Sequence, residues 1–389
     1  MSYTHYDRLS ALDATFLALE DANVHMHVGA VQIFDGDGIV GADGGLDIDR
    51  IRGLSEPALR RNARFRQRIE RIPYFDHPVW VDDPTFRNEY HLRHTSLPEP
   101  GDLRQLKRLA GRIFSQKLDP GRPLWELWFV EGLEERRFAV ISKIHHCMID
   151  GVSGADLLAG FLQGSAEGGG DPGMPRWVPR PAPPAGRLLR DELARRTRLP
   201  FAAAAATLGA VGSPRRAIRS ARSALEAVAE SLVAGLGSAS ETPLNASVGP
   251  YRRFDWTRMD IAAVKEARGD SGGTLNDVVL AVVSGAMRNF LQRRGVDVDA
   301  LDFRAMLPVN VRAEKEHGKL GNRVSFLMAR LPVHERSPQT RLARVIETTR
   351  KLKSSDTVRG TELVEEISDL GMTSLFADFA WLGARTRSY

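Results

Sequence analysis

The segment HHCMIDG, residues 145–151, carries the side chains of this sequence that are best suited to acid–base chemistry. It comes directly after an apolar run, RFAVISKI, whose composition predicts a β-strand. Because side chains alternate along a strand, we expect His146 to share a face with Ile144 and Ser142, and His145 to point to the other face. An imidazole titrates near neutral pH and can take a proton from a hydroxyl. The two histidines should therefore have different roles.

Asp150 and Gly151 begin a turn that leads into VSGADLLAGF, an apolar segment with helical spacing. The histidines are thus expected where a strand ends and a helix begins. A carboxylate four residues after His146 can pair with a cation and brace the turn without touching a substrate. This makes Asp150 an architectural residue in the prediction.

Other interpretations of the same segment remain open. A histidine pair at the end of an apolar strand can be purely structural. Cys147 is a candidate nucleophile, but nothing near it obviously lowers a thiol pKa, and buried cysteine usually serves as inert packing. A zinc site is disfavoured because adjacent strand histidines diverge, and the sequence has neither an HExxH helix nor a cysteine cluster. No metal site is predicted.

Length and composition bound the class of protein. A chain of 389 residues favours two globular units, and 42% hydrophobic with 26% charged residues is ordinary globular usage. One cysteine excludes an intrachain disulfide and favours a reducing compartment. The first residues show no secretory signal, so a cytoplasmic location is expected. The net charge of +5 comes without any nucleic-acid-binding motif, and nucleic acid is not expected as a partner.

The domain organisation is indicated by a stretch rich in Gly and Pro, residues 164–186, that is typical of a linker. We predict a first domain over 1–165, a linker and helical bridge over 166–248 with breaks at Pro200 and Pro214, and a second domain over 249–389. Both domains mix strands with helices, which predicts an α/β or α+β fold. The expected strands cover 27–34, 136–146, 251–259 and 302–312, and the expected helices cover 102–117 and 274–295.

Several segments together resemble a known family. HHCMIDG matches the HHxxxDG motif of the chloramphenicol acetyltransferase-like superfamily, and the surrounding chain looks like the bacterial wax ester synthase/diacylglycerol acyltransferase family. The segments that agree occur in the order LSALDATFLALE, HMHVGAVQIF, PLWELWFVEGL, TLNDVVLAVVSGAMRNFL, LPVNVR and GNRVSFLMARLP. The likeness extends over nearly the whole chain.

The resemblance implies two chloramphenicol acetyltransferase-like domains, each a mixed sheet with flanking helices, that meet along a channel. It implies acyl-CoA as co-substrate, with no other cofactor, and a long-chain alcohol or diacylglycerol as acceptor, giving a wax ester or triacylglycerol. His146 would act as the general base in a ternary complex without an acyl-enzyme. The resemblance counts His145 and Asp150 with His146 among the catalytic residues of the motif, and Gly151 supports its turn.

The resemblance also marks residues outside HHCMIDG. Asn276 would stabilise the oxyanion, or would merely cap a helix together with Thr274, and Asp277 would favour the same helix start. Arg312 would pair with Asp150, or would instead face solvent.

The resemblance marks the PLWE segment as structural. Within it, Pro123, Leu124 and Trp125 would pack the channel wall.

The bridge and the end of the chain raise further expectations. Residues 187–222 carry nine arginines against Asp191 and Glu192, so this surface would dock peripherally on an anionic membrane or a lipid droplet, or would be an ordinary solvated helix pair. Family members continue past ARTRSY, so the second domain is expected to be incomplete. Two alternatives remain: a condensation-like acyltransferase that takes its acyl group from a carrier protein, and a non-catalytic lipid-binding relative.

Overall fold

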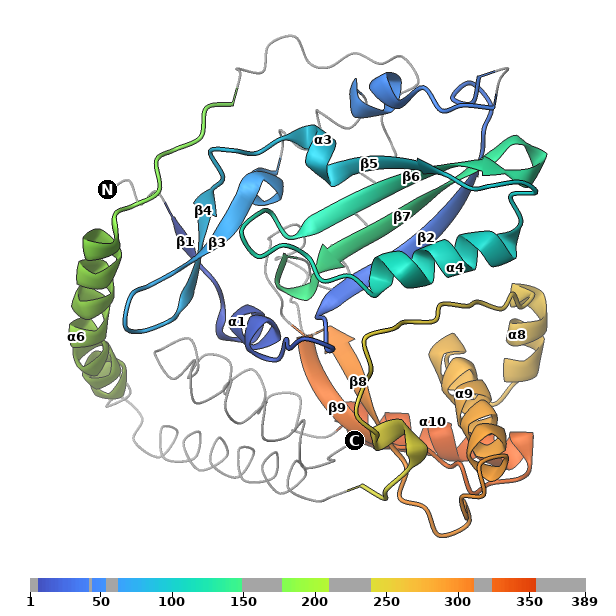
Figure 1. The fold of residues 1–389 in the computed structure, drawn as a ribbon. Helices are drawn as coiled ribbons and strands as arrows, with labels where there is room; N and C mark the ends of the chain where they lie inside the picture. The colour runs from blue at the N-terminus through green and yellow to red at the C-terminus, as the bar shows by residue number, and fades with distance from the viewer. Residues whose placement is uncertain are drawn as a thin grey trace. The chain divides into compact units, whose positions relative to one another are not determined.

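The computed structural model describes residues 6–41, 44–53, 62–148, 177–209, 239–310 and 324–354. Contacts between residues divide the chain into two units. The first unit contains the chain up to Thr197 together with Gly249–Asp255, and the second contains most of the remaining residues. Both units combine strands with helices, so the predicted mixed α/β class is confirmed (Figure 1). The predicted boundaries at 165 and 248 remain predictions.

The first unit is built on two sheets. Its strands are β1 (Asp7–Arg8), β2 (His27–Asp35), β3 (Gln67–Arg71), β4 (Pro78–Asp82), β5 (Leu92–Ser96), β6 (Trp125–Leu133) and β7 (Arg137–His145). Its helices are α1 (Ala11–Ala18), α3 (Asn88–His91), α4 (Leu103–Phe114) and the part of α6 (Ala185–Gly209) up to Thr197, with short 3₁₀ turns η1 (Ala63–Arg66), η2 (Glu134–Arg136) and η3 (His146–Met148).

The larger sheet has the strand order β2-β7-β6-β5 and the smaller one the order β1-β4-β3. In the larger sheet, β7 runs antiparallel to both β2 and β6, whereas β5 and β6 are parallel. The register of β2 on β7 places His27 opposite His145. Directly opposite residues of an antiparallel pair project from the same face, so these two histidines are cross-strand neighbours.

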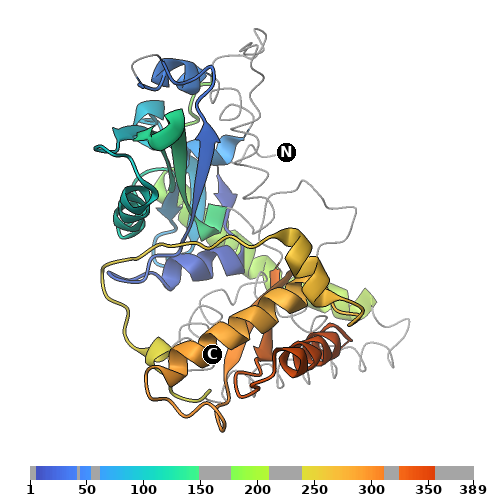
Figure 2. The same cartoon turned by 90° about the vertical axis from the view of Figure 1, so that its right-hand side faces the viewer.

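Helix α4 covers one face of the larger sheet (Figure 2). Asp102 caps it in a reciprocal capping box with Gln105, as expected for the start of a helix at this point. Its buried residues recur at helical spacing and lie on one side: Leu106, Ala110, Ile113 and Phe114. The ring of Phe114 lies so close to Gly29 of β2 that a Cβ there would come within 2.4 Å of it. Glycine at this strand position is therefore required for the helix to approach.

The opposite face of the same sheet packs into the main hydrophobic core. Trp125, Leu127 and Phe129 of β6 and Val140 and Ile144 of β7 belong to it. With both faces covered, β7 is buried along almost its whole length, which is why its sequence is a nearly continuous apolar run.

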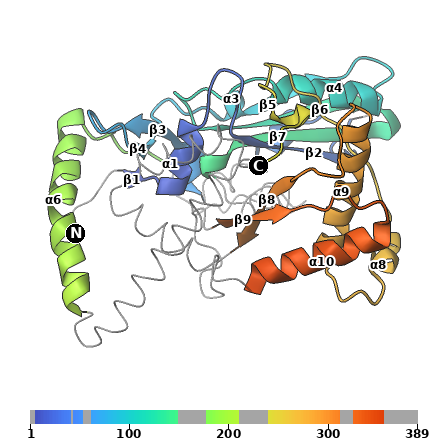
Figure 3. The same cartoon turned by 90° about the horizontal axis from the view of Figure 1, so that it is seen from below.

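Helix α6 corrects one prediction. The chain was expected to break at Pro200, yet α6 continues to Gly209 as one helix (Figure 3). A proline removes one backbone N–H from a helix, but the five consecutive alanines at 202–206 are the strongest helix formers and favour continuation. At its start, Leu188 packs against Ile72 and Val79 of the first unit.

The second unit holds α8 (Ile261–Arg268), α9 (Leu275–Gln292), α10 (Pro338–Ser354), the 3₁₀ turn η5 (Pro243–Asn245), and the antiparallel pair β8 (Arg304–Asn310) and β9 (Val324–Arg330). Helix α9 packs against α10, which also contacts β9 (Figures 2 and 3). The predicted helix over 274–295 and the predicted strand over 302–312 both form, with slightly narrower bounds.

The strand predicted at 251–259 was wrong, because residues 251–260 form no ladder. Its first part is held by other contacts within the first unit. The Arg252 N–H donates to Ser115 Oγ at 2.8 Å, and the Phe254 ring meets Phe114 edge-on. The Arg252 N–H is thus bound to a side chain and not to a neighbouring strand.

Several predictions fall outside the described residues. They concern Asp150, Gly151, the helix expected after them, Arg312 and the break at Pro214. Of the predicted linker, residues 177–184 are described and have no regular structure. They are nevertheless anchored, since the Arg180 guanidinium and N–H bind both carboxylate oxygens of Asp82.

Two buried histidines, His77 and His91, and the half-buried His27 predict acid-sensitive folding of the first unit. Burial lowers the pKa of His27, His77 and His91 from 6.5 to about 4. Between these values the unfolded chain binds more protons, so the stability that is present above pH 6.5 is lost as the pH falls toward 4. We expect the free energy of unfolding to fall by on the order of 3 kcal/mol per pH unit around pH 5.5. Urea titrations followed by tryptophan fluorescence would measure it, and a slope that His91→Gln leaves unchanged would contradict the assignment.

Candidate functional site

The predicted catalytic segment begins where β7 ends. His145 is the last residue of the strand and His146 the first of the single turn η3. The His146 N–H donates to Met26 O at 2.8 Å, which continues the β2–β7 register by one residue, and the next residues curl into the turn. The expectation that His146 shares a face with Ile144 stays a prediction.

The His146 ring is half-buried and stacks on Phe16 of α1. The two ring centroids are 4.0 Å apart, with an interplanar angle of 23°. Burial lowers the pKa of His146 below 6.5, and the neighbouring His145 acts in the same direction. The imidazole is therefore neutral at physiological pH, which is the form that can accept a proton.

His145 has a different environment. It is buried, and its backbone N–H donates to Leu124 O at 2.9 Å. Its Nδ1 accepts the Cys147 N–H at 3.1 Å, so the ring proton belongs on Nε2. That atom lies 3.4 Å from Glu20 Oε1. All three of these contacts are with the protein itself, so the residue supports the turn.

Glu20 is a residue that the sequence analysis missed. It lies just after α1 and contacts three separate parts of the first unit. Oε1 accepts the Met26 N–H at 3.0 Å and faces His145, and Oε2 lies 3.0 Å from Lys117 Nζ. Burial alone would raise the pKa of Glu20, but the contacts with His145, Lys117 and Met26 lower it to about 2. In the sequence, Glu20 is marked by its place at the end of the LSALDATFLALE segment. No spacing rule connects that position to the histidines.

Lys143 and Glu126 form a second buried ion pair on the same face of the sheet. Their side chains approach to 3.2 Å, and Lys143 Nζ also donates to the carbonyls of Ile113 and Gln116 at the end of α4. Burial lowers the pKa of Lys143, whereas the opposite charge of Glu126 and the helix C-terminus favour the ammonium. This pair fixes α4 on β6 and β7 beside the histidines.

Cys147 is less suited to react than its neighbours His145 and His146. It is buried in the turn that packs against α1, and burial raises the pKa of its thiol well above 9.0. A thiol in this state is not the nucleophilic thiolate. The Sγ atom lies 3.0 Å from His145 Nδ1 and serves the packing of the turn.

The predicted PLWE residues lie within the core of the first unit. Pro123 is buried, and Leu124 and Trp125 are 2% and 0% exposed. The Trp125 indole donates to Phe65 O at 2.8 Å and its ring stacks on His91. Through the Leu124 carbonyl, this segment also holds the backbone of His145.

In the second unit, the predicted Asn276 lies in the first turn of α9 with an exposed side chain. Capping the helix was the alternative role predicted for Asn276, but the cap is formed by Thr274 and Asp277. Thr274 Oγ1 accepts the Asp277 N–H, and Asp277 Oδ2 accepts the Thr274 N–H at 2.7 Å. Asp277 is buried and also accepts a hydrogen bond from Thr349 of α10. Asp277 thus joins two helices in addition to favouring a helix start.

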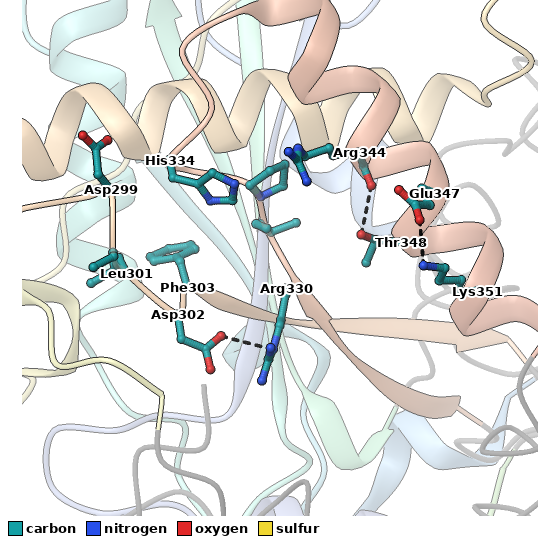
Figure 4. Close-up of a pocket in the computed structure, with 13 residues that line it drawn as sticks. Asp299, Leu301, Asp302, Phe303, Arg330, His334, Arg344, Glu347, Thr348 and Lys351 are labelled. Carbon is teal, nitrogen blue, oxygen red and sulfur yellow. Dashed lines mark hydrogen bonds and ion pairs between the residues drawn. The ribbon is translucent and has the colours of Figure 1, made fainter.

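A separate cavity of about 540 Å³ lies in the second unit between the start of β8, the end of β9 and α10 (Figure 4). Several of its charged side chains pair with one another. Arg330 lies 3.3 Å from Asp302, and Lys351 lies 2.6 Å from Glu347. The described residues that line this cavity include none of the predicted site residues.

Two features were not found within the described parts of the chain. No three His, Cys, Asp or Glu side chains are grouped as metal ligands would be. No described helix combines the length and apolar character needed to cross a bilayer.

Comparison with known proteins places this geometry in a family. The wax ester synthase/diacylglycerol acyltransferase catalytic domain matches residues 9–279, and the C-terminal domain of the same family matches residues 320–386. The chain belongs to this family. It is an acyltransferase of the wax ester synthase/diacylglycerol acyltransferase type, and the resemblance inferred from HHCMIDG is confirmed.

Curated relatives are similar over most of the chain. A probable diacylglycerol O-acyltransferase of Mycobacterium tuberculosis is 30% identical over 348 residues, which are 86% of this chain and 69% of the relative. A putative diacylglycerol O-acyltransferase of the same species is 36% identical over 349 residues, covering 86% and 71%.

Solved structures agree on the fold. The wax ester synthase/diacylglycerol acyltransferase from Marinobacter aquaeolei VT8 covers 97% of this chain and 79% of its own, with a TM-score of 0.58 and 24% identity. The first condensation domain of the CDA synthetase gives a TM-score of 0.53 at 18% identity, covering 92% of this chain and 75% of its own. The predicted chloramphenicol acetyltransferase-like fold is confirmed.

The stacking of Phe16 on His146 gives a direct prediction. In Phe16→Ala, the imidazole loses the surface that restricts its orientation, so kcat should fall by about 10-fold or more while KM changes little. Steady-state rates of acyl transfer would measure this. Phe34→Ala is the matched control. Phe34 of β2 stacks on Phe138 of β7 at the end of these strands that is far from His146. Equal losses in the two variants would contradict a role specific to Phe16.

Proposed function

We propose that this enzyme transfers a fatty acyl group from acyl-CoA to the hydroxyl of a long-chain alcohol or of diacylglycerol, with His146 as the general base. One observation carries the proposal. The imidazole within the family's motif directly follows the end of β7, stacks on Phe16, and is kept neutral by burial, which lowers its pKa. These are the properties that a base acting on an alcohol needs.

In the proposed reaction, His146 removes the hydroxyl proton as the acceptor oxygen attacks the thioester carbonyl. The tetrahedral intermediate then collapses, the carbon–sulfur bond breaks, and the imidazolium returns its proton to the CoA thiolate. Both substrates are bound together, and no acyl-enzyme forms. A positioned base contributes about 10²- to 10⁴-fold to such a step. Holding the two reactants together supplies a further part of the acceleration.

The remaining motif residues have supporting roles in the proposal. Asn276 would donate to the oxyanion, and its exposed amide is available for that contact. Asp150 would pair with Arg312 and brace the turn together with Gly151. His145 would act through the backbone of the turn, since its ring already contacts Cys147 and Glu20.

The names of the relatives support the choice of substrates. The curated relatives are named diacylglycerol O-acyltransferases, and the Marinobacter protein is named for both wax ester synthase and diacylglycerol acyltransferase activity. The likeness to condensation domains concerns the fold alone. A carrier protein as acyl donor is therefore an alternative that an assay with different donors can reveal, as is a lipid-binding protein without turnover.

Contact with a lipid surface through α6 is also part of the proposal, with a cytoplasmic location at the membrane face or at lipid inclusions. Two arginines of this helix are already paired with a carboxylate. Arg195 and Arg196 both bind Glu192, at 3.0 and 2.8 Å. Arg190 lies at a longer distance, 3.9 Å, from Asp191, and its side chain is 76% exposed, so it is a better candidate to meet an anionic headgroup.

The test is release of free CoA thiol from palmitoyl-CoA, with and without hexadecanol or diacylglycerol. We expect acceptor-dependent release, with identification of the ester product by mass spectrometry. His146→Ala should lower the rate by about 10²- to 10⁴-fold without loss of folding. Release only from an acylated carrier protein would favour the condensation-like alternative, and a folded protein without turnover on any donor would favour the lipid-binding one.

A further inference from the structure

We propose that Glu20 is a positioning residue for catalysis, which holds the His146 turn in its reactive geometry through His145 and the Met26 peptide. This inference rests on the proposed role of His146 as the base. Glu20 does not touch the reacting atoms. It acts through two groups that each fix one end of the His146 backbone.

The first connection runs through Met26. Glu20 Oε1 accepts the Met26 N–H at 3.0 Å, and the carbonyl of the same residue accepts the His146 N–H at 2.8 Å. Because both groups belong to Met26, a carboxylate that holds the N–H restricts where the carbonyl can lie. Met26 immediately precedes β2, so this connection also sets where the turn meets the sheet.

The second connection runs through His145. The ring can accept the Cys147 N–H at Nδ1 only if its proton is on Nε2. Glu20 Oε1, 3.4 Å from Nε2, is an acceptor and an anion, and it favours a proton at that position. The amide after His146 thus depends on the tautomer that Glu20 selects. The His146 N–H donates to Met26 and the Cys147 N–H to His145, and Glu20 contacts both of these acceptor residues.

Packing alone does not explain an acid at this position. The Glu20 side chain is only 10% exposed, and a buried carboxylate has a desolvation cost that an apolar side chain would not have. That cost is offset by Lys117, 3.0 Å away on the segment after α4. The arrangement directs one carboxylate oxygen to the turn and the other to a partly exposed cation that keeps the group ionised.

The experiment compares Glu20→Ala with Glu20→Gln in the full-length chain. In Glu20→Ala, kcat for acyl transfer should fall by about 10- to 100-fold with KM for palmitoyl-CoA nearly unchanged. Glu20→Gln keeps an oxygen acceptor for Met26 and His145, so it should recover kcat to within about 5-fold of the parent. Recovery by the amide distinguishes positioning from a need for charge.

Glu192→Ala is the matched control. Glu192 is also a buried carboxylate of the first unit, its pKa is also lowered to about 2, and it binds Arg8, Arg195 and Arg196 away from the histidines. Its replacement should lower the thermal midpoint while leaving kcat per folded molecule unchanged. A fall in kcat equal to that of Glu20→Ala would overturn the proposal, because it would trace the effect to lost ion pairs in general.

A double-mutant cycle with His146→Ala supplies an independent measure. If Glu20 acts through the base, its removal should not lower the residual rate of His146→Ala further, whereas additive losses would overturn the proposal. Should Glu20→Ala fail to fold, Glu20→Gln and ¹⁵N NMR of the parent still test it. The His145 ring must then be protonated on Nε2, and a proton on Nδ1 would overturn the inference. If His146→Ala itself retains full activity, the proposed function fails and not merely the role of Glu20.

Discussion

The antiparallel register of β2 on β7 is the constraint on which the candidate site depends. It places His27 opposite His145 and thereby sets the Met26 carbonyl where the His146 N–H can reach it. A shift by one residue would turn every side chain of β2 to the other face and remove this partner from the turn. Contacts on both faces favour this register, since Gly29 admits the Phe114 ring on one face and Phe34 packs against the main core on the other.

The charged side chains near the histidines are paired with one another. The cations and carboxylates on the α4 side are paired, with Lys143 on Glu126 and Lys117 on Glu20, while the imidazoles of His27 and His146 have pKa values that burial lowers. Neutral rings beside compensated charges give a region in which a base is available at neutral pH. The second unit likewise uses one carboxylate for two contacts, because Asp277 both caps α9 and binds Thr349 of α10.

Local pattern was sufficient for most of the predicted elements and insufficient for their partners. The run of apolar residues in β7, the capping residues of α4 and α9, and the HHxxxDG motif all lie within short windows, and the sequence predicted them. The strand expected at 251–259 failed because forming a ladder requires a neighbour that composition does not reveal. Pro200 failed as a breaker because the alanines beyond it outweigh one missing N–H. Glu20 escaped notice because it lies far from His145 in the sequence, and only the fold brings them together.

The position of Cys147 has a practical consequence. It is the one cysteine in the chain, its thiol is buried, and it lies in the same turn as His146, the proposed base. A thiol-specific reagent can therefore reach Cys147 only when the packing around the turn opens. The rate of that modification reports how often the reactive segment opens, so the native chain already contains a single-site reporter of local motion.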